Sequence, residues 1–149
     1  MRILRPAVTP IGLQLAATAR NVGRAFNQAL TEAGGSLPIW LILASLKGSH
    51  WRTQLELARS VGIEGPTLTR HLDGMEQAGL VKRRRHPDDR RAFQVELTAA
   101  GEAMHKELLK SVITFNTRLR RGISADEVDA LRDILERMAA NVAEPDSDG

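Results

Sequence analysis

The sequence predicts a mainly α-helical fold with one small β-hairpin, and three observations favour it. Over most of the chain, apolar residues recur at steps of three and four, the period of an amphipathic helix. After Gly79 the period changes to two, since Phe93, Val95 and Leu97 alternate with polar residues. The 149 residues are enough to bury a core without disulfide bonds, which a chain with no cysteine cannot form.

Capping residues and glycines mark the ends of the first two predicted helices. The first is expected to begin at Thr9-Pro10, where a capping residue precedes a proline, and to end at Gly34-Gly35. The second runs from Leu37 to about Leu46 and is closed by Lys47-Gly48-Ser49. It is apolar nearly all round, so we expect it to be the central buried helix.

Two shorter helices follow. Thr53 and Glu56 form a capping box at the start of the first, and Gly62 turns the chain after it. The second is expected to run from Gly65 to Ala78, with the next glycine as its stop. The residues expected to face the core are Leu55, Ala58 and Val61 from the first helix and Leu68, Leu72 and Met75 from the second.

A strongly basic hairpin comes next. Its predicted strands are 80–83 and 92–97, and His86-Pro87-Asp88-Asp89 is typical of the turn between them. From Leu80 to Arg91 there are six Lys or Arg residues and two Asp residues, although the net charge of the whole chain is only +3. Such an excess can be a solvated turn, but beside two short helices it indicates a surface for phosphate groups.

The chain ends in two more predicted helices with apolar stripes. Thr98 caps the first, Gly122 breaks it, and Ser124 with Glu127 forms a second capping box. These stripes, and that of the first helix, can pack on the rest of the chain or on a second copy. We favour a second copy in a two-fold dimer, since residues 36–98 can enclose their own core. The stripe of the last helix is Val128, Leu131, Leu135, Met138 and Val142.

The helix that begins near Gly65 is the predicted DNA-recognition helix. Arg70 lies opposite its apolar side, where the guanidinium can bond two guanine acceptors or pair with Asp73. Thr67 and Thr69 can contact phosphate or a thymine methyl group, although Thr67 can instead cap the helix. The predicted contacts are Pro66, Thr67, Thr69, Arg70 and His71, the last of which can equally be half-buried packing.

The hairpin is predicted to grip the neighbouring groove. Arg90 and Arg91 follow the turn, where an arginine can enter the narrow minor groove, and Asp89 can hold one of them in a bidentate pair. Residues 82–85 alternate between the faces of a strand, so some must point away from DNA. The predicted hairpin contacts are Arg84, Arg85, Asp89, Arg90 and Arg91, with Thr53 and Lys82 at the DNA backbone.

Five short motifs, in this order and spacing, resemble the multiple-antibiotic-resistance regulator (MarR) family of winged-helix transcription factors. Each is weak alone, but together they are specific, and the resemblance covers nearly the whole chain. The motifs are Thr53-Gln54-Leu55-Glu56-Leu57-Ala58, Gly65-Pro66-Thr67-Leu68-Thr69-Arg70, Glu76-Gln77-Ala78-Gly79-Leu80-Val81, Asp89-Arg90-Arg91 and Leu97-Thr98-Ala99-Ala100-Gly101.

The resemblance implies a winged helix-turn-helix fold and an obligate homodimer that binds a pseudo-palindromic operator in double-stranded DNA, usually as a repressor. Many members are released from DNA by a small aromatic acid or phenol. The family's aspartate-any-arginine wing motif falls on Asp89 and Arg91, which makes Arg91 the preferred minor-groove arginine. The implied organisation is one domain, 1–149, with a DNA-binding lobe at 36–98, dimerisation helices at 9–33 and 99–142, and an acidic tail at 143–149.

The sequence says less about a ligand pocket. Arg20 and Arg24 can meet a carboxylate or simply be solvated, and Trp40 can be a pocket wall or core; His50 and Trp51 complete the candidates. No metal or cofactor is expected, because there is no cysteine and the four histidines are scattered.

Other functions fit the sequence less well. A winged helix can bind protein instead of DNA, but the hairpin here is basic, and an activator without a small-molecule ligand stays open. An enzyme is not expected, since the chain has no Tyr or Cys and no catalytic spacing or glycine-rich phosphate loop stands out. A cytoplasmic protein is expected, because no apolar run reaches the ~18 residues of a membrane span and no signal peptide is recognisable.

Overall fold

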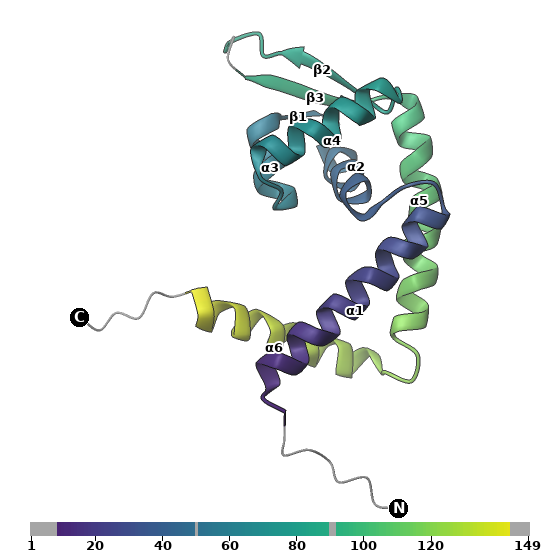
Figure 1. The fold of residues 1–149 in the computed structure, drawn as a ribbon, viewed down its shortest axis with the longest axis vertical. Helices are drawn as coiled ribbons and strands as arrows, with labels where there is room; N and C mark the ends of the chain where they lie inside the picture. The colour runs from purple at the N-terminus through teal and green to yellow at the C-terminus, as the bar shows by residue number, and fades with distance from the viewer. Residues whose placement is uncertain (1–8, 50, 90–91, 144–149) are drawn as a thin grey trace, which may run out of the picture. The chain divides into compact units, whose positions relative to one another are not determined.

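The computed structural model describes residues 9–49, 51–89 and 92–143, and these contain six helices and three short strands (Figure 1). The strands are β1 (Trp51–Thr53), β2 (Val81–Arg85) and β3 (Phe93–Leu97), in one antiparallel sheet of order β1-β3-β2. The predicted class, mainly α with a β-hairpin, is confirmed. The helices are α1 (Ile11–Glu32), α2 (Leu37–Ser49), α3 (Gln54–Val61), α4 (Gly65–Gln77), α5 (Ala99–Leu119) and α6 (Ala125–Ala143).

The chain divides into two compact units, residues 1–113 and 114–149. In the first unit α2 is the central helix, as its composition predicts, because it contacts α1, α3, α4 and the sheet. Its side chains Ile42, Leu43 and Leu46 are fully buried. The other core residues around it are Leu30, Leu57, Leu68, Leu72, Met75, Leu80, Val81, Val95, Leu97 and Leu108.

The second unit contains the end of α5 and all of α6. Its capping box is confirmed, since Ser124 Oγ accepts a hydrogen bond from the Glu127 N–H and the Glu127 carboxylate accepts one from the Ser124 N–H. None of the described residues of α6, 125–143, is buried. The apolar stripe predicted for this helix is half-buried at Val128 and Met138 and exposed at its other three residues, with Leu131 50% and Val142 85% accessible.

Two helix boundaries differ from the prediction. Pro10, not Thr9, is the N-cap of α1, and the Pro10 carbonyl accepts the first helical hydrogen bonds without help from a capping side chain. The second helix continues through Gly48 to Ser49 instead of ending at Leu46. A glycine inside a helix costs only about 1 kcal/mol, which the packing of Leu46 in the core can offset.

The inward side of α3 also differs from the prediction. Leu57 is fully buried, whereas Leu55, expected to face the core, is 61% exposed. The two lie about 160° apart around a helix, and Leu57, Ala58 and Val61 share the inward stripe. The strand β1 was not predicted, because three residues are too few to show alternation and the strand exists through its pairing with β3.

No single helix among the described residues is long and apolar enough to cross a membrane. The helices α1 and α2 meet such a criterion only as a pair, with a bend of 78° between them. The apolar character of α2 is accounted for by its place in the core of the first unit.

The helix α4, the hairpin and α5 meet at one tight junction. The Thr98 hydroxyl donates to the Gly79 carbonyl at 2.6 Å and accepts from the Gly101 N–H at 3.0 Å, so Thr98 caps α5 as predicted. The Thr98 N–H donates to the Leu80 carbonyl at 3.1 Å. A Cβ atom on Gly101 would lie 2.1 Å from that carbonyl oxygen, so only glycine fits here.

We expect Gly101→Ala to destabilise the protein by roughly 1–3 kcal/mol, the usual cost of forcing extra volume into packed structure. The matched control is Gly74→Ala, also inside a helix, where a Cβ would meet nothing within 4 Å. That change should be neutral or stabilising by about 0.5–1 kcal/mol, because alanine favours helix. Urea unfolding at one protein concentration measures both, and equal stability of the two variants would contradict the packing described for the junction.

Candidate nucleic-acid interface

The helix α4 has one buried side and one exposed side. Leu68, Leu72 and Met75 are buried in the core, which fixes the helix and leaves Thr67 and Arg70 at the surface. Arg70 forms no hydrogen bond or ion pair within the part of the chain that the structure describes, so the alternative of pairing with Asp73 is not adopted. Its guanidinium is therefore available to an external acceptor.

The first turn of α4 is exposed as well. Glu64 is the N-cap residue, without a side-chain capping bond, so Thr67 does not cap the helix. Pro66 lies in the first turn, where its missing N–H costs nothing. His71 is half-buried, which matches the packing alternative that the sequence left open.

The hydroxyl of Thr69 is engaged inside the protein. It donates to the Gly65 carbonyl at 3.0 Å and accepts from Gln54 Nε2 at 2.8 Å. The single hydroxyl proton is thus already used, and in this geometry Thr69 cannot donate to a phosphate. Gln54, which the sequence reasoning missed, joins α3 to α4; its position beside the capping residue Thr53 was the only signal.

The basic residues of β2 have different surroundings. Arg83 is the least exposed of those in ion pairs: its guanidinium lies 2.5 Å from Asp73 Oδ1 and 3.4 Å from Glu76 Oε1, and its backbone N–H donates to Glu76 Oε2 at 3.0 Å. The hydrogen bond from Arg83 lowers the pKa of Glu76, and the bond to Glu76 raises the pKa of Arg83. The alternation of residues 82–85 predicts that some of them point away from DNA, and Arg83 is one that packs toward the protein.

Two predicted hairpin contacts also have partners within the chain. Arg84 forms an ion pair with Glu96 on β3, and the Arg85 guanidinium lies 6.0 Å from the centre of the Phe93 ring. Lys82 and Asp89 are exposed, and the Thr53 hydroxyl accepts from the Glu56 N–H in the predicted capping box. Arg90 and Arg91 lie outside the described residues.

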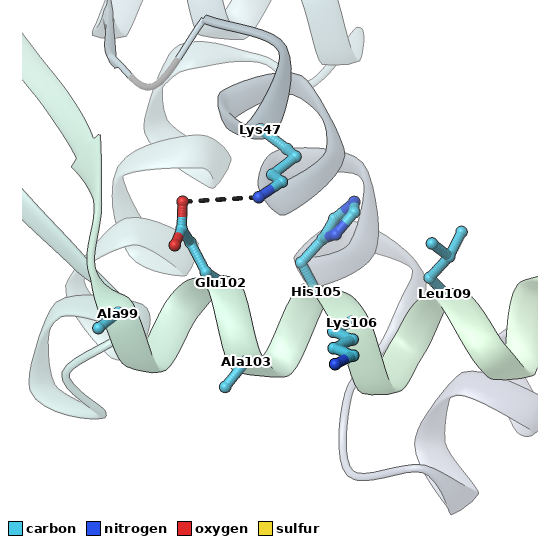
Figure 2. A pocket seen from close by; sticks show the side chains of 7 residues that line it. All are labelled: Lys47, Ala99, Glu102, Ala103, His105, Lys106 and Leu109. Carbon is cyan, nitrogen blue, oxygen red and sulfur yellow. Dashed lines mark ion pairs between the residues drawn. The ribbon is translucent and has the colours of Figure 1, made fainter.

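A separate open hollow of about 480 Å³ lies beside α5 in the first unit. Figure 2 shows Lys47 from α2 and Glu102 and His105 from α5 turned toward one another, with Lys47 Nζ 3.5 Å from a Glu102 oxygen. The His105 ring stacks on Trp40, with the ring centres 5.0 Å apart. Burial, and secondarily the charge of Lys47, lowers the pKa of His105 below its ordinary value.

The predicted pocket residues do not line this hollow. Trp40 borders it only through His105, Arg24 donates to the Asn21 side chain at 2.5 Å, and Arg20 is exposed. His50 and the side chain of Trp51 lie outside what the structure describes. His105 was missed because it is far from Trp40 in the sequence and belongs to no motif.

An exposed helix fixed by a neighbouring short helix, next to a basic β-hairpin, defines the class of winged helix-turn-helix DNA-binding proteins. Residues 36–93 match the model of the MarR family. A solved structure of transcriptional regulator PA3341 is 35% identical, with a TM-score of 0.77, over 90% of this chain and 98% of that one. The chain belongs to the MarR family of DNA-binding transcriptional regulators.

Two similar structures contain DNA. The transcriptional repressor CouR, bound to a 23-mer DNA duplex, is 30% identical with a TM-score of 0.80, over 87% of this chain and 92% of that one. A mutant MarR from E. coli, complexed with operator DNA, is 26% identical with the same TM-score, over 87% of this chain and 93% of that one.

We expect the His105 imidazole to titrate below the ordinary value of 6.5. Because the folded state disfavours the proton, this group contributes stability above pH 6.5 that is lost as the pH falls through its folded-state pKa. An NMR titration of the imidazole C–H signals measures the pKa directly. His105→Phe keeps a ring against Trp40 and should remove this part of the pH dependence of the melting temperature. A His105 pKa at or above 6.5 would contradict the burial of the imidazole described above.

Proposed function

We propose that the protein is a homodimeric repressor that binds a pseudo-palindromic operator and leaves it when a small aromatic acid or phenol binds. The observation that carries the DNA-binding part is α4, which buries one side completely and leaves Arg70 and Thr67 exposed and unpaired among the described residues. The repressor role is supported by similarity to CouR, a transcriptional repressor seen on DNA.

In this proposal α4 enters the major groove. Arg70 bonds a guanine, and Thr67 contacts phosphate or a thymine methyl group, with Pro66 and His71 at the margins of the contact. Thr69 holds the helix in place through Gln54 rather than donating to DNA.

The hairpin reaches the minor groove through Arg91, with Arg90 and Asp89 beside it, while Lys82 and the Thr53 hydroxyl proton meet the DNA backbone. To reach phosphate, Arg84 would have to leave its ion pair with Glu96, and Arg85 would have to leave the ring of Phe93.

The second copy in the dimer would cover apolar residues that one chain leaves exposed. At the start of α1, Ile11 and Leu13 are more than 60% accessible, and α6 presents Leu131 and Leu135. A helix without buried residues has little stability of its own, so α6 needs a partner. These surfaces support dimerisation helices at 9–33 and 99–142 around a DNA-binding lobe at 36–98.

The ligand part of the proposal is supported by the hollow beside α5. Lys47 supplies a cation for a carboxylate, and the His105 ring, which stacks on Trp40, supplies a flat surface for an aromatic ring. In this proposal Lys47 replaces Arg20 and Arg24 as the favoured partner of an acid.

Arg70→Ala and Arg91→Ala should each weaken operator binding by ~1–3 kcal/mol, and the loss at Arg70 should also relax the preference for one base pair. Arg59→Ala is the matched control, because it removes the same charge from an exposed residue to which the proposal assigns neither a DNA contact nor a place in the dimer interface. Fluorescence anisotropy with a duplex from the protein's own promoter region measures the affinities. A confirmed dimer that does not bind this DNA at low salt, where electrostatic binding is strongest, would refute the DNA-binding proposal.

For the ligand, we expect both benzoate and phenol to raise the melting temperature, since each would bind the native protein selectively. Lys47→Met should abolish the effect of benzoate and spare that of phenol, which has no carboxylate to pair. A benzoate shift that survives Lys47→Met unchanged would rule out this site for the acid.

A further inference from the structure

We propose that Arg83 is a positioning residue: it fixes the hairpin against α4, and it serves DNA binding through geometry rather than through contact with phosphate. This inference rests on the proposed DNA interface, in which α4 and the hairpin must meet one duplex together. Arg83 would thus orient the hairpin, whereas the neighbouring Lys82 is proposed to contact the DNA backbone.

The alternation of β2 directs Arg83 differently from Lys82 and Arg84. Val81, two residues earlier and on the same face, is buried, and the residue opposite Arg83 on β3 is the fully buried Val95. The side chain of Arg83 is accordingly only 20% exposed, compared with 65% for Arg84. The Arg83 face of the strand is therefore the one that packs toward the protein.

On that face, Arg83 reaches two carboxylates of α4 at once. Asp73 and Glu76 are three residues apart, which places them one turn from each other on the same side of the helix. The guanidinium lies 2.5 Å from the first and 3.4 Å from the second. A forked cation between two acceptors has few alternative arrangements, so the distance between hairpin and helix is closely set.

The backbone adds a second attachment. Because β3 lies between β1 and β2, the strand β2 is at the edge of the sheet. Some of its N–H groups therefore have no acceptor on another strand. The Arg83 N–H donates at 3.0 Å to Glu76 Oε2. Glu76 thus accepts from both the main chain and the side chain of Arg83, and a hinge motion of β2 away from α4 would break both bonds.

The charges of the cluster explain why it matters for DNA. Two carboxylates on the recognition helix would repel phosphate groups if they were unpaired. Arg83 supplies one positive charge to the two carboxylates, which lowers the net charge of the cluster from −2 to −1, and the lowered pKa of Glu76 is consistent with that pairing. For Arg83 to contact phosphate instead, it would have to leave both acceptors and expose their charge to the duplex.

The first experiment compares Arg83→Ala with Lys82→Ala, an exposed cation next to it on the opposite face of β2. Affinity for the promoter duplex is measured by anisotropy between 50 and 200 mM salt, as is typical for such titrations. We expect Arg83→Ala to bind about 5- to 30-fold more weakly, a change of one to two kcal/mol, with an unchanged slope of log affinity against log salt. Lys82→Ala should lower that slope by about 1.

A slope lowered by about 1 in Arg83→Ala would mean that Arg83 contacts phosphate and would overturn the proposal. An unchanged affinity would overturn it as well. Melting temperatures of both variants confirm that they fold, and Arg83→Lys provides a folded alternative that keeps the charge. Because lysine lacks the fork, Arg83→Lys should recover only part of the affinity; full recovery would show that charge alone suffices and that no fixed geometry is needed.

The second experiment tests the attachment without DNA, so that failure of the proposed function and failure of this inference can be told apart. Hydrogen exchange of the Arg83 amide is followed by NMR in wild type and in Glu76→Ala, with Glu107→Ala on α5 as the control. We expect roughly tenfold faster exchange only in Glu76→Ala, because its acceptor is gone. Equal exchange in all three proteins would overturn the attachment even if the wild type binds DNA.

Discussion

The junction between Gly79 and Gly101 fixes the hairpin relative to α4, and the proposed DNA-binding surface requires both. Here α4 ends, β2 begins, β3 ends and α5 begins. The Thr98 hydroxyl and the Leu80 carbonyl hold these ends together through hydrogen bonds. The Leu80 N–H also returns to the Met75 carbonyl at 2.9 Å, which ties the turn to the helix before it. The direction of the hairpin is therefore set where it leaves the core, and the Arg83 cluster holds it further along.

The basic hairpin is less uniform than its composition indicates. Arg83 and Arg84 are paired with carboxylates, and Arg85 lies over an aromatic ring. Net charge over such a segment overstates the number of cations that can meet phosphate, since each internal pair has to break first. Among the basic residues of β2, Arg83, Arg84 and Arg85 each have a partner within the chain, whereas Lys82 is exposed.

The sequence was sufficient for what depends on local chemistry. The capping boxes at Thr53 and Ser124 and the buried side of α4 were all correctly predicted, because each follows from a few adjacent residues. Interactions between distant segments were not predictable in this way. The stacking of Trp40 on His105, the bond from Gln54 to Thr69, and the two carboxylates around Arg83 depend on how elements pack, and no spacing along the chain encodes them. The error at Leu55 came from stepping by threes along a helix that repeats every 3.6 residues.

In the proposed complex, two chains present two copies of α4 and of the hairpin to a single duplex. Native mass spectrometry of the protein with a duplex that carries one operator measures this stoichiometry, because it counts chains and duplexes in the same complex. We expect a complex of two chains with one duplex, and a dimer when DNA is omitted. A complex of one chain with one duplex, formed by a protein that is monomeric on its own, would contradict it.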